Sequence, residues 1–198
     1  MSESARAMIE ASRVARIAAL RERLTEQLKG TNQITLEIGC GHGHFLAAYA
    51  EAFPEKYCIG VDLLTKRIER GNRKRDRGEF TNLDFIKAEA TELLEAIPPH
   101  IHLAEIFFLF PDPWPKKRHH KNRLIQAAML DRLAALSLPG QTRLHFRTDD
   151  ADYFAWSMNL VSKNPAWKLL PEAPWPFEQE TFFSKILPVY QSLIAQRQ

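Results

Sequence analysis

The residues best suited to chemistry lie in the stretch Phe108 to Leu124, which reads FLFPDPWPKKRHHKNRL. An apolar run ends just before Asp112, a carboxylate between two prolines that restrict the backbone on either side. Trp114 follows and offers a ring face on which an extruded base can stack. Basic residues run from Lys116 to Arg123, and such cations contact phosphates. The stretch therefore predicts a fixed carboxylate beside an aromatic ring and a surface for a polyanion.

A second candidate site is the glycine-rich stretch LEIGCGHGHF, Leu36 to Phe45, which reads as a strand, a tight turn and a helix start. Glycines Gly39, Gly41 and Gly43 allow close backbone approach, and the helix N-terminus offers unpaired N–H groups. A dehydrogenase would carry G-x-G-x-x-G, but here the third glycine comes one residue early. The spacing therefore disfavours a nicotinamide oxidoreductase.

Two carboxylates accompany this glycine loop. Glu37 precedes the loop, where it would repel a pyrophosphate but attract an ammonium or a sulfonium. Asp62 lies about 20 residues beyond the loop, at the end of the next expected strand, where a carboxylate can accept both hydroxyls of a ribose. Together they predict a site for a cationic nucleoside, S-adenosylmethionine.

Histidine and cysteine provide no comparable signal. His42 and His44, like His100 and His102, form H-x-H pairs, but no third ligand of suitable type accompanies them, so we expect no metal site. The two cysteines do not form a C-x-x-C pair, which argues against a disulfide framework, and Cys40 is expected to fill the glycine turn as a small residue.

The 198-residue chain has an ordinary globular composition, with 45% hydrophobic and 26% charged residues. Its length suits one domain over 1–198, with a basic amphipathic helical segment over 1–30. No apolar run approaches the ~20 residues that span a bilayer, and the N-terminus lacks the apolar core of a secretory signal. These features predict a cytoplasmic protein without a membrane partner.

Basic residues gather in three clusters although the net charge is only +3. Each cluster alone is consistent with a solvated helix face, whereas three clusters in a nearly neutral chain favour a polyanionic partner. The clusters are Arg6, Arg13, Arg16, Arg21 and Arg23; Lys66, Arg67, Arg70, Arg73, Lys74, Arg75 and Arg77; and the stretch from Lys116 to Arg123.

Strand and helix patterns alternate five times with short connections, which predicts an α/β fold with a doubly wound, mainly parallel sheet flanked by helices. The expected strands are Ile34–Gly39, Tyr57–Leu64, Leu83–Ala88, His102–Phe110 and Thr142–Thr148. The expected helices are one from Ile17 to about Gly30, Phe45–Phe53, a basic helix ending near Gly78, Ala90–Ile97, Leu124–Leu136 and Asp152–Asn164. The stretch PEAPWPFEQ, Pro171–Gln179, is expected as a surface loop before a last strand.

The motif FPDPWPKKRHHKNRL, Phe110 to Leu124, resembles the signature of the bacterial tRNA (guanine-N7)-methyltransferases. The resemblance covers the chain from about Leu36 to Tyr190. It implies a Rossmann-like class I methyltransferase fold, S-adenosylmethionine as methyl donor and tRNA as substrate. The methylated atom would be N7 of a guanosine in the tRNA variable loop (m7G46). We expect the protein to be a monomer or a homodimer.

Functional residues follow from the same resemblance, position by position. It implies a catalytic role for Asp112 and guanosine contacts by Lys116, Asp149 and, through a weaker match, Thr181. It implies cofactor contacts by Glu37, Asp62, Glu89 and Asp112. We expect Gly39, Gly41, Gly43 and Ala90 to contact the cofactor as well.

The chain departs from the family pattern at two places. Glu89 stands where relatives usually carry Asp, which keeps the charge but extends the side chain by one carbon. Relatives also carry a Thr-x-Phe/Tyr-Glu element near the C-terminus, whose nearest match here is Thr181–Ser184, with Ser in place of Glu. Two alternatives therefore remain open: a methyltransferase acting on another RNA base or a small molecule, and a noncatalytic RNA-binding protein that retains the fold.

Overall fold

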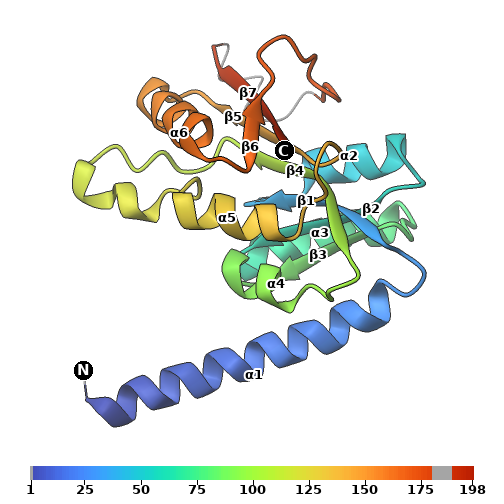
Figure 1. The fold of residues 1–198 in the computed structure, drawn as a ribbon. Coiled ribbons are helices and arrows are strands. Elements are labelled where there is room, and N and C mark those ends of the chain that lie inside the picture. Colours follow the sequence, from blue (N-terminus) through green and yellow to red (C-terminus); the bar gives the residue numbers. More distant parts are fainter. Residues whose placement is uncertain (1, 180–188) are drawn as a thin grey trace.

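A computed structural model describes residues 2–179 and 189–198 and shows a seven-stranded sheet in the order β3-β2-β1-β4-β5-β7-β6 (Figure 1). Strands β1 to β5 are parallel, and β7 pairs antiparallel with both β5 and β6. The strands are β1 (Gln33–Ile38), β2 (Tyr57–Asp62), β3 (Leu83–Lys87), β4 (His102–Leu109), β5 (Arg143–Thr148), β6 (Trp167–Leu169) and β7 (Gln191–Arg197). The predicted fold class and the five predicted strands are confirmed.

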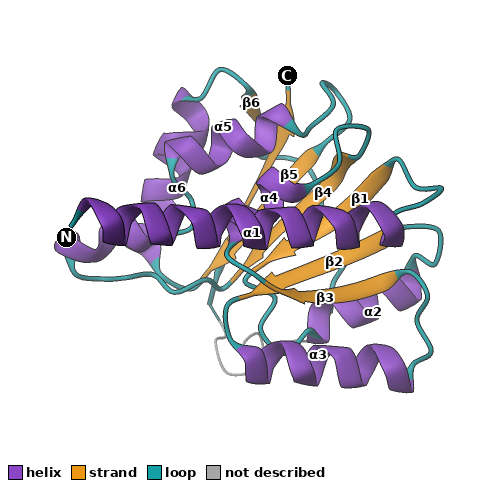
Figure 2. Ribbon diagram, turned by 90° about the horizontal axis from the view of Figure 1, so that it is seen from below, coloured by secondary structure: helices purple, strands orange, loops and turns teal. Residues whose placement is uncertain are grey.

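Helices cover both faces of the sheet. The core on one face joins α1, α4, α5 and α6 to the strands, and the core on the other face joins α2 and α3 (Figure 2). The helices are α1 (Glu3–Gln27), α2 (His44–Ala52), α3 (Thr65–Arg77), α4 (Ala90–Ala96), α5 (Ala127–Ala135) and α6 (Ala151–Lys163), with a 3₁₀ helix η1 (Lys117–Asn122). Strands β1, β2 and β5 are therefore buried on both sides, over all but their first residue.

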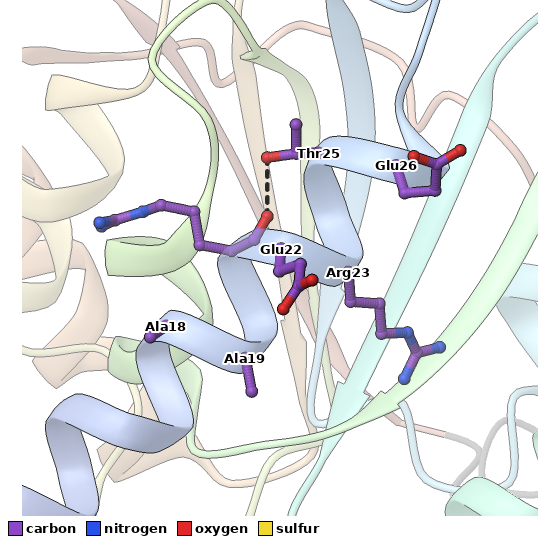
Figure 3. Close-up of a pocket in the computed structure, with 7 residues that line it drawn as sticks. Ala18, Ala19, Glu22, Arg23, Thr25 and Glu26 are labelled. Carbon is purple, nitrogen blue, oxygen red and sulfur yellow. Dashed lines mark hydrogen bonds between the residues drawn. The ribbon is translucent and has the colours of Figure 1, made fainter.

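Helix α1 is longer than its apolar periodicity predicts, because Ser2 caps its N-terminus by accepting a hydrogen bond from the backbone N–H of Ala5. Figure 3 shows a shallow hollow on α1, lined by Ala18, Ala19 and neighbouring residues of this helix alone. The hollow lies toward the end of α1 that leads into the amino end of β1, away from the strand ends that carry the candidate residues. We assign it no function.

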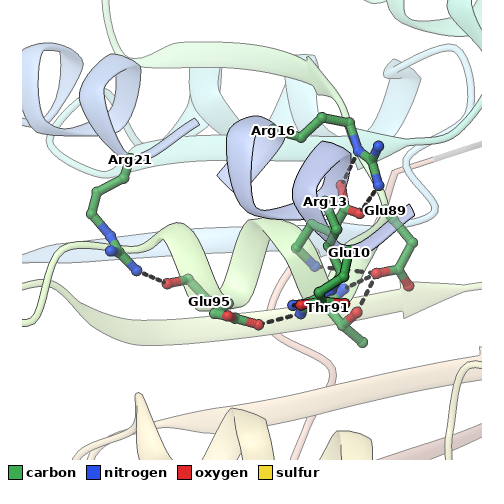
Figure 4. Close-up of polar contacts among 8 residues, drawn as sticks. Glu10, Arg13, Arg16, Arg21, Glu89, Thr91 and Glu95 are labelled. Atoms are coloured by element: carbon green, nitrogen blue, oxygen red, sulfur yellow. Dashed lines mark hydrogen bonds and ion pairs between the residues drawn. The ribbon is translucent and has the colours of Figure 1, made fainter. Parts of the chain in front are cut away.

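Four of the five arginines in the N-terminal basic cluster bond to the rest of the domain. Arg13 pairs with Glu95, and Arg16 Nε donates to Glu92 Oε2 at 2.9 Å (Figure 4). Arg21 donates to the backbone carbonyl of Glu95 at 2.7 Å, and Arg23 pairs with Asp84 at 2.6 Å. These arginines hold α1 against α4 and β3, so the cluster is not a free surface for a polyanion.

Apolar burial contributes more to the docking of α1 than these ion pairs do. The side chains of Ile17, Leu24 and Leu28 are buried, and each contributes ~1.5–3 kcal/mol. The arginines are partly exposed although Glu92 and Asp84 are buried, so solvent weakens these ion pairs toward the ~0.2–1 kcal/mol of surface pairs. The arginines therefore set the position of α1, while the apolar stripe supplies most of the binding free energy.

The segment Pro171–Gln179 is not the plain surface loop that its composition predicts. Phe177 packs within 6.0 Å of the ring centroids of Phe45, Tyr49 and Phe53. Arg147 in β5 stacks on Trp175 at 3.8 Å and pairs with Glu178 at 2.6 Å. The segment thus covers the sheet face beside α2. No helix in the described residues is both long and apolar enough to cross a membrane.

Candidate active site

Five parallel strands end at one edge of the sheet, and each brings an acidic residue there. Glu37 lies near the end of β1, and Asp62 is the last residue of β2. Glu89 follows β3, Asp112 follows β4 and Asp149 follows β5. The strand order reverses between β1 and β4, and ligands of doubly wound sheets bind outside the carboxyl ends of strands at such a point. We call this edge the acidic edge.

The glycine loop is connected by hydrogen bonds to the end of β2. Gly39, Gly41 and Gly43 have φ angles of 79°, 53° and 68°, in the left-handed region that glycine adopts readily. A Cβ atom on Gly43 would lie 2.3 Å from the ring of Phe85, so this position is closed to a side chain. The backbone N–H of Gly41 donates to Asp62 Oδ2 at 3.1 Å, which fixes the loop relative to this carboxylate.

Asp62 has most of its accepting capacity filled. Its Oδ1 accepts from the backbone N–H of Leu64 at 2.8 Å, and its Oδ2 accepts from Gly41 and from Arg67 Nη1 at 3.3 Å. A carboxylate offers about four lone-pair sites, so one site, on Oδ1, has no donor among the described residues. A ribose diol needs one site on each oxygen. Arg67, a partly exposed side chain held by the longest of the three bonds, must therefore leave if Asp62 is to accept both hydroxyls.

Glu37 is the most buried carboxylate of the acidic edge. It is 4% exposed, and its Oε2 is buried without a hydrogen-bond partner in the described structure. Burial, and secondarily the negative charge of Asp62, raise the pKa of Glu37 to about 8. A buried carboxylate oxygen without a donor is unfavourable unless a ligand supplies the positive charge or the donor.

These residues fit S-adenosylmethionine. Glu37 offers a carboxyl oxygen without a partner that becomes an anionic acceptor when a bound cation favours its ionisation, Asp62 offers acceptors for a ribose, and the glycine loop allows close backbone approach. When bound, this cofactor supplies an electrophilic methyl group on a cationic sulfur. Glu37, Asp62 and the glycine loop would hold it.

Glu89 is engaged with its own helix. Its Oε2 accepts from the backbone N–H groups of Thr91 and Glu92 at 3.0 and 3.1 Å, and from the Thr91 hydroxyl. This contact caps α4, whose first residue is the half-buried Ala90. Among the described residues Oε1 has no hydrogen-bond partner. A cofactor contact by Glu89 would therefore use this second oxygen and stays a prediction.

The segment after β4 is a strained loop that presents its polar side chains to solvent. Phe110 and Trp114 have positive φ angles of 50° and 48°, which non-glycine residues rarely adopt. Between them, Asp112 is exposed and has no hydrogen-bond or ion-pair partner in the described part of the chain. Lys116 is likewise exposed and unpaired there. Both are accessible to a substrate at the acidic edge.

Arg123 does not belong to the phosphate-binding run in which the sequence placed it. Its side chain is fully buried, and its Nη2 pairs with Asp152 at 2.5 Å. Its Nε donates to the backbone carbonyl of Pro113 at 2.8 Å, and its guanidinium lies over the rings of Tyr153 and Trp156 at 4.8 and 5.3 Å. Arg123 therefore anchors the loop that carries Asp112 to helix α6.

Of the three predicted substrate residues, Lys116 and Asp149 lie within the described part of the chain and Thr181 does not. Asp149 is exposed at the end of β5, next to β4 in the sheet, and has no side-chain partner among the described residues. The following residue, Asp150, caps α6 by accepting from the backbone N–H of Tyr153 at 2.6 Å. Thr181, and the element Thr181–Ser184 as a whole, lies outside the described residues.

The sequence patterns did not predict the roles of two residues at this edge, namely Arg67 as a partner of Asp62 and Arg123 as a loop anchor. The pairing of Arg67 could have been predicted, because Arg67 lies five residues after Asp62 at the start of a helix. For Arg123 there was none, because Asp152 is 29 residues away.

Of the paired histidines, His42 contacts helix α3. His42 lies beside α3, where its backbone carbonyl accepts from Lys74 Nζ at 2.7 Å and its ring nitrogen lies 3.4 Å from Arg70 Nη1. Within residues 2–179 and 189–198, no group of three or more His, Cys, Asp or Glu residues could hold a metal ion. Partial burial and the neighbouring cations lower the pKa of His42.

Comparison with solved structures gives methyltransferases of low sequence identity, which bears on the fold alone. The aminoglycoside resistance methyltransferase NpmB1 matches with a TM-score of 0.62 at 18% identity, over 90% of this chain and 93% of that chain. A variant 16S rRNA adenine-N1 methyltransferase from Catenulisporales acidiphilia with the cosubstrate SAM gives 0.58 at 17% identity, over 89% and 91%.

Curated relatives carry the name tRNA (guanine-N(7)-)-methyltransferase. The relative from Corynebacterium diphtheriae is 35% identical over 144 residues, 73% of this chain and 54% of its own length. The relative from Halorhodospira halophila is 40% identical over 126 residues, 64% of this chain and 54% of its own length. The chain thus spans about half the length of these two relatives.

A family model described as "Putative methyltransferase" matches residues 31–191. This range holds the glycine loop, the acidic edge and the loop after β4. The chain belongs to this methyltransferase family.

Proposed function

We propose that this protein transfers the methyl group of S-adenosylmethionine to N7 of a guanosine in tRNA. The observation that carries the proposal is the buried Glu37 oxygen without a partner, which lies beside Asp62 at the carboxyl ends of the strands. A pair of acids in this place suits a ligand with positive charge and a ribose. The substrate is taken from the names of the relatives. Because this chain spans only about half of the length of these relatives, that assignment is a proposal.

The chemistry at N7 requires positioning more than proton transfer. Guanine N7 carries a lone pair and no proton, so no general base is required. The guanine ring becomes cationic as the N–C bond forms. Asp112, held next to that ring, stabilises the developing charge and accepts hydrogen bonds from guanine N–H groups. Preorganised charge of this kind contributes roughly 3–4 kcal/mol, and orientation contributes up to ~7–11 kcal/mol.

The substrate would meet the protein at the β4–β5 side of the acidic edge. Lys116 and Asp149 are exposed there without partners in the described structure, as residues that contact a substrate would be. Trp114, whose ring lies 5.8 Å from that of His119, offers a stacking face. We further propose that the protein acts in the cytoplasm as a monomer or a homodimer, on a guanosine of the tRNA variable loop.

The transfer of tritium from methyl-labelled S-adenosylmethionine to bulk tRNA tests this function. Label in acid-precipitable tRNA supports methyl transfer to RNA. Label in small molecules alone would indicate a different substrate class. If the protein binds tRNA but transfers no label, the protein is an RNA-binding module that retains the fold, and the proposal fails.

Arg67→Ala is expected to bind S-adenosylmethionine up to about five-fold more tightly than the wild type. The reason is that Arg67 competes with the ribose for Asp62 Oδ2 through an ion pair that solvent weakens on the partly exposed arginine side, to roughly 1 kcal/mol or less. Isothermal titration calorimetry measures the change, with Lys66→Ala, an exposed neighbour without an ion pair in the described residues, as the control. Weaker binding by Arg67→Ala would show that Arg67 contacts the cofactor instead.

Arg123→Lys is expected to lower the turnover number at least about ten-fold and to leave cofactor affinity within about two-fold. Lysine keeps the charge but cannot bond both Pro113 and Asp152 with a planar fork, so the loop that carries Asp112 shifts. Steady-state kinetics separates kcat from KM. Arg23→Lys, which alters an arginine pair with Asp84 away from the acidic edge, is the control. Equal turnover in the two variants would contradict a positioning role.

A further inference from the structure

Helix α3 carries a row of four cations on the side that faces away from the core. Lys66, Arg70, Arg73 and Arg77 are all exposed. At 3.6 residues per turn they fall within an arc of about 60°. The buried residues of the helix, Ile68 and Gly71, lie on the opposite side. We call these four residues the α3 stripe.

The α3 stripe has no acidic partner within the described part of the chain, unlike Arg67 and Arg75 of the same helix. Arg67 pairs with Asp62, and Arg75 pairs with Asp84 at 2.8 Å and with Asp76 at 2.8 Å. The stripe residues form no ion pair with any described carboxylate. This distinguishes the stripe from the N-terminal arginines, which bond within the domain and so serve its folding.

Placing like charges three and four residues apart has an energetic cost. Each such pair destabilises a helix by ~0.2–0.5 kcal/mol. The field of the stripe also reaches its neighbour, since partial burial and then Arg77, Arg70 and Arg73 lower the pKa of Lys74. The repulsion is not offset by ion pairs inside the described structure, so a negatively charged partner outside the chain accounts for it best.

The stripe begins at the edge of the candidate active site. Helix α3 starts at Thr65, three residues after Asp62. Arg70 and Lys74 both contact His42 of the glycine loop, at 3.4 and 2.7 Å, which fixes the helix to that loop. From the first to the last residue, the stripe extends about 16 Å along the helix axis at 1.5 Å per residue.

A second group of unpaired cations lies on the other side of the acidic edge. Lys116, Lys117 and Lys121 are exposed after β4 and have no ion-pair partner among the described residues. Helix α3 follows β2, whereas this group follows β4, and β1 separates these two strands in the sheet. The acids that are proposed to hold the cofactor therefore lie between two positive surfaces.

We propose that the α3 stripe is a phosphate-binding surface for the RNA substrate, separate from the basic run after β4. The inference rests on the proposed function and extends it. One part of the tRNA backbone lies on the run after β4, next to the reacting guanosine, and another part lies along α3. The stripe would contribute to affinity and its salt dependence, without contact to the guanosine or the cofactor.

The test compares two triple charge reversals in the full chain. The first replaces Lys66, Arg73 and Arg77 by Glu and spares Arg70, which contacts the glycine loop. The control replaces Arg132, Lys163 and Lys168 by Glu, three exposed cations on α5, α6 and β6 without ion pairs in the described structure. Both variants change the net charge equally. Fluorescence anisotropy with an unmodified tRNA transcript measures affinity between about 50 and 200 mM salt.

The stripe variant is expected to lose at least about ten-fold in tRNA affinity at the upper salt concentration. Its log–log salt slope should be smaller in magnitude than that of the wild type by ~2–3, because three phosphate contacts are lost. The control should keep the wild-type slope and lie within about three-fold in affinity. Unchanged S-adenosylmethionine affinity and melting temperature in both variants would show that the fold and the cofactor site are intact.

The outcomes separate this inference from the proposed function. Equal slopes and affinities in the two variants, with methyl transfer by the wild type intact, would overturn the role of the stripe and leave the proposed function standing. Stripe-dependent tRNA binding without methyl transfer by the wild type would overturn the function and support the surface. The absence of tRNA binding by the wild type would overturn both.

Discussion

Asp112→Asn is expected to remove most methyl transfer and to leave S-adenosylmethionine affinity within a few-fold. The substitution keeps the size and much of the hydrogen bonding of the side chain but removes its negative charge. Asp112 is exposed between two positive-φ residues and has no partner in the described structure, so its loss should not disturb the fold. Loss of a preorganised charge aimed at the transition state lowers kcat by ~10²–10³.

Single-turnover methyl transfer at saturating tRNA and cofactor measures this effect on the chemical step. Glu55→Gln, which neutralises an exposed carboxylate just before β2 at the opposite edge of the sheet, is the matched control and should keep wild-type rates. A wild-type rate in Asp112→Asn would remove the carboxylate from the mechanism. A lost rate together with a lost cofactor affinity would reassign Asp112 to cofactor binding.

Glu37→Gln is expected to weaken S-adenosylmethionine binding and, at alkaline pH, to stabilise the protein without cofactor. Binding weakens by about 10- to 100-fold, because a charged hydrogen bond contributes ~1.5–3 kcal/mol. In the wild type, Glu37 must ionise to hold the cation. Since its pKa is raised to about 8, wild-type affinity should rise with pH up to this value, while that of Glu37→Gln stays flat.

Ionisation of Glu37 favours cofactor binding but destabilises the protein without cofactor, because the folded state disfavours the ionised carboxylate. The pKa rises from 4.5 to about 8 on folding, so between these values the folded protein retains a proton that the unfolded chain releases. The contribution of Glu37 to the free energy of unfolding therefore falls as pH increases through this range, by ~1.4 kcal/mol per pKa unit, and levels off above it.

Denaturant unfolding and calorimetric titration at several pH values test both effects. Glu37→Gln should match the wild type near pH 4.5 and exceed its free energy of unfolding by several kcal/mol above about pH 8. Asp84→Asn provides a contrast, because Asp84 is a buried carboxylate that is paired with two arginines. This substitution should lower the free energy of unfolding. A Glu37→Gln variant with wild-type stability and affinity at every pH would contradict the account of this carboxylate.

Local patterns in the sequence predicted the parts of the site that depend on short-range structure. The glycines and Glu37 are contiguous with β1, and Asp62 ends β2, so strand and turn patterns alone place them at one edge. Asp112 follows an apolar run, and its position after β4 required only the end of that run. These assignments depend on chain direction and strand period, which a sequence shows directly.

Contacts between distant side chains could not be predicted in this way. The basic residues near Arg123 look alike in sequence, but Arg123 is buried because Asp152 and two rings surround its guanidinium. The arginines of α1 likewise look like a surface for a polyanion until their carboxylate partners on α4 and β3 are located. The segment with Phe177 has the composition of a loop, yet the half-buried Phe177 packs against aromatic residues of α2.

Nucleoside analysis of tRNA incubated with the purified protein and S-adenosylmethionine tests the central claim most directly. The account predicts that 7-methylguanosine appears in proportion to the enzyme and time, and that it is absent when Asp112→Asn replaces the wild type. A different methylated nucleoside, or tRNA that stays unmodified under conditions where the protein binds both ligands, would contradict it.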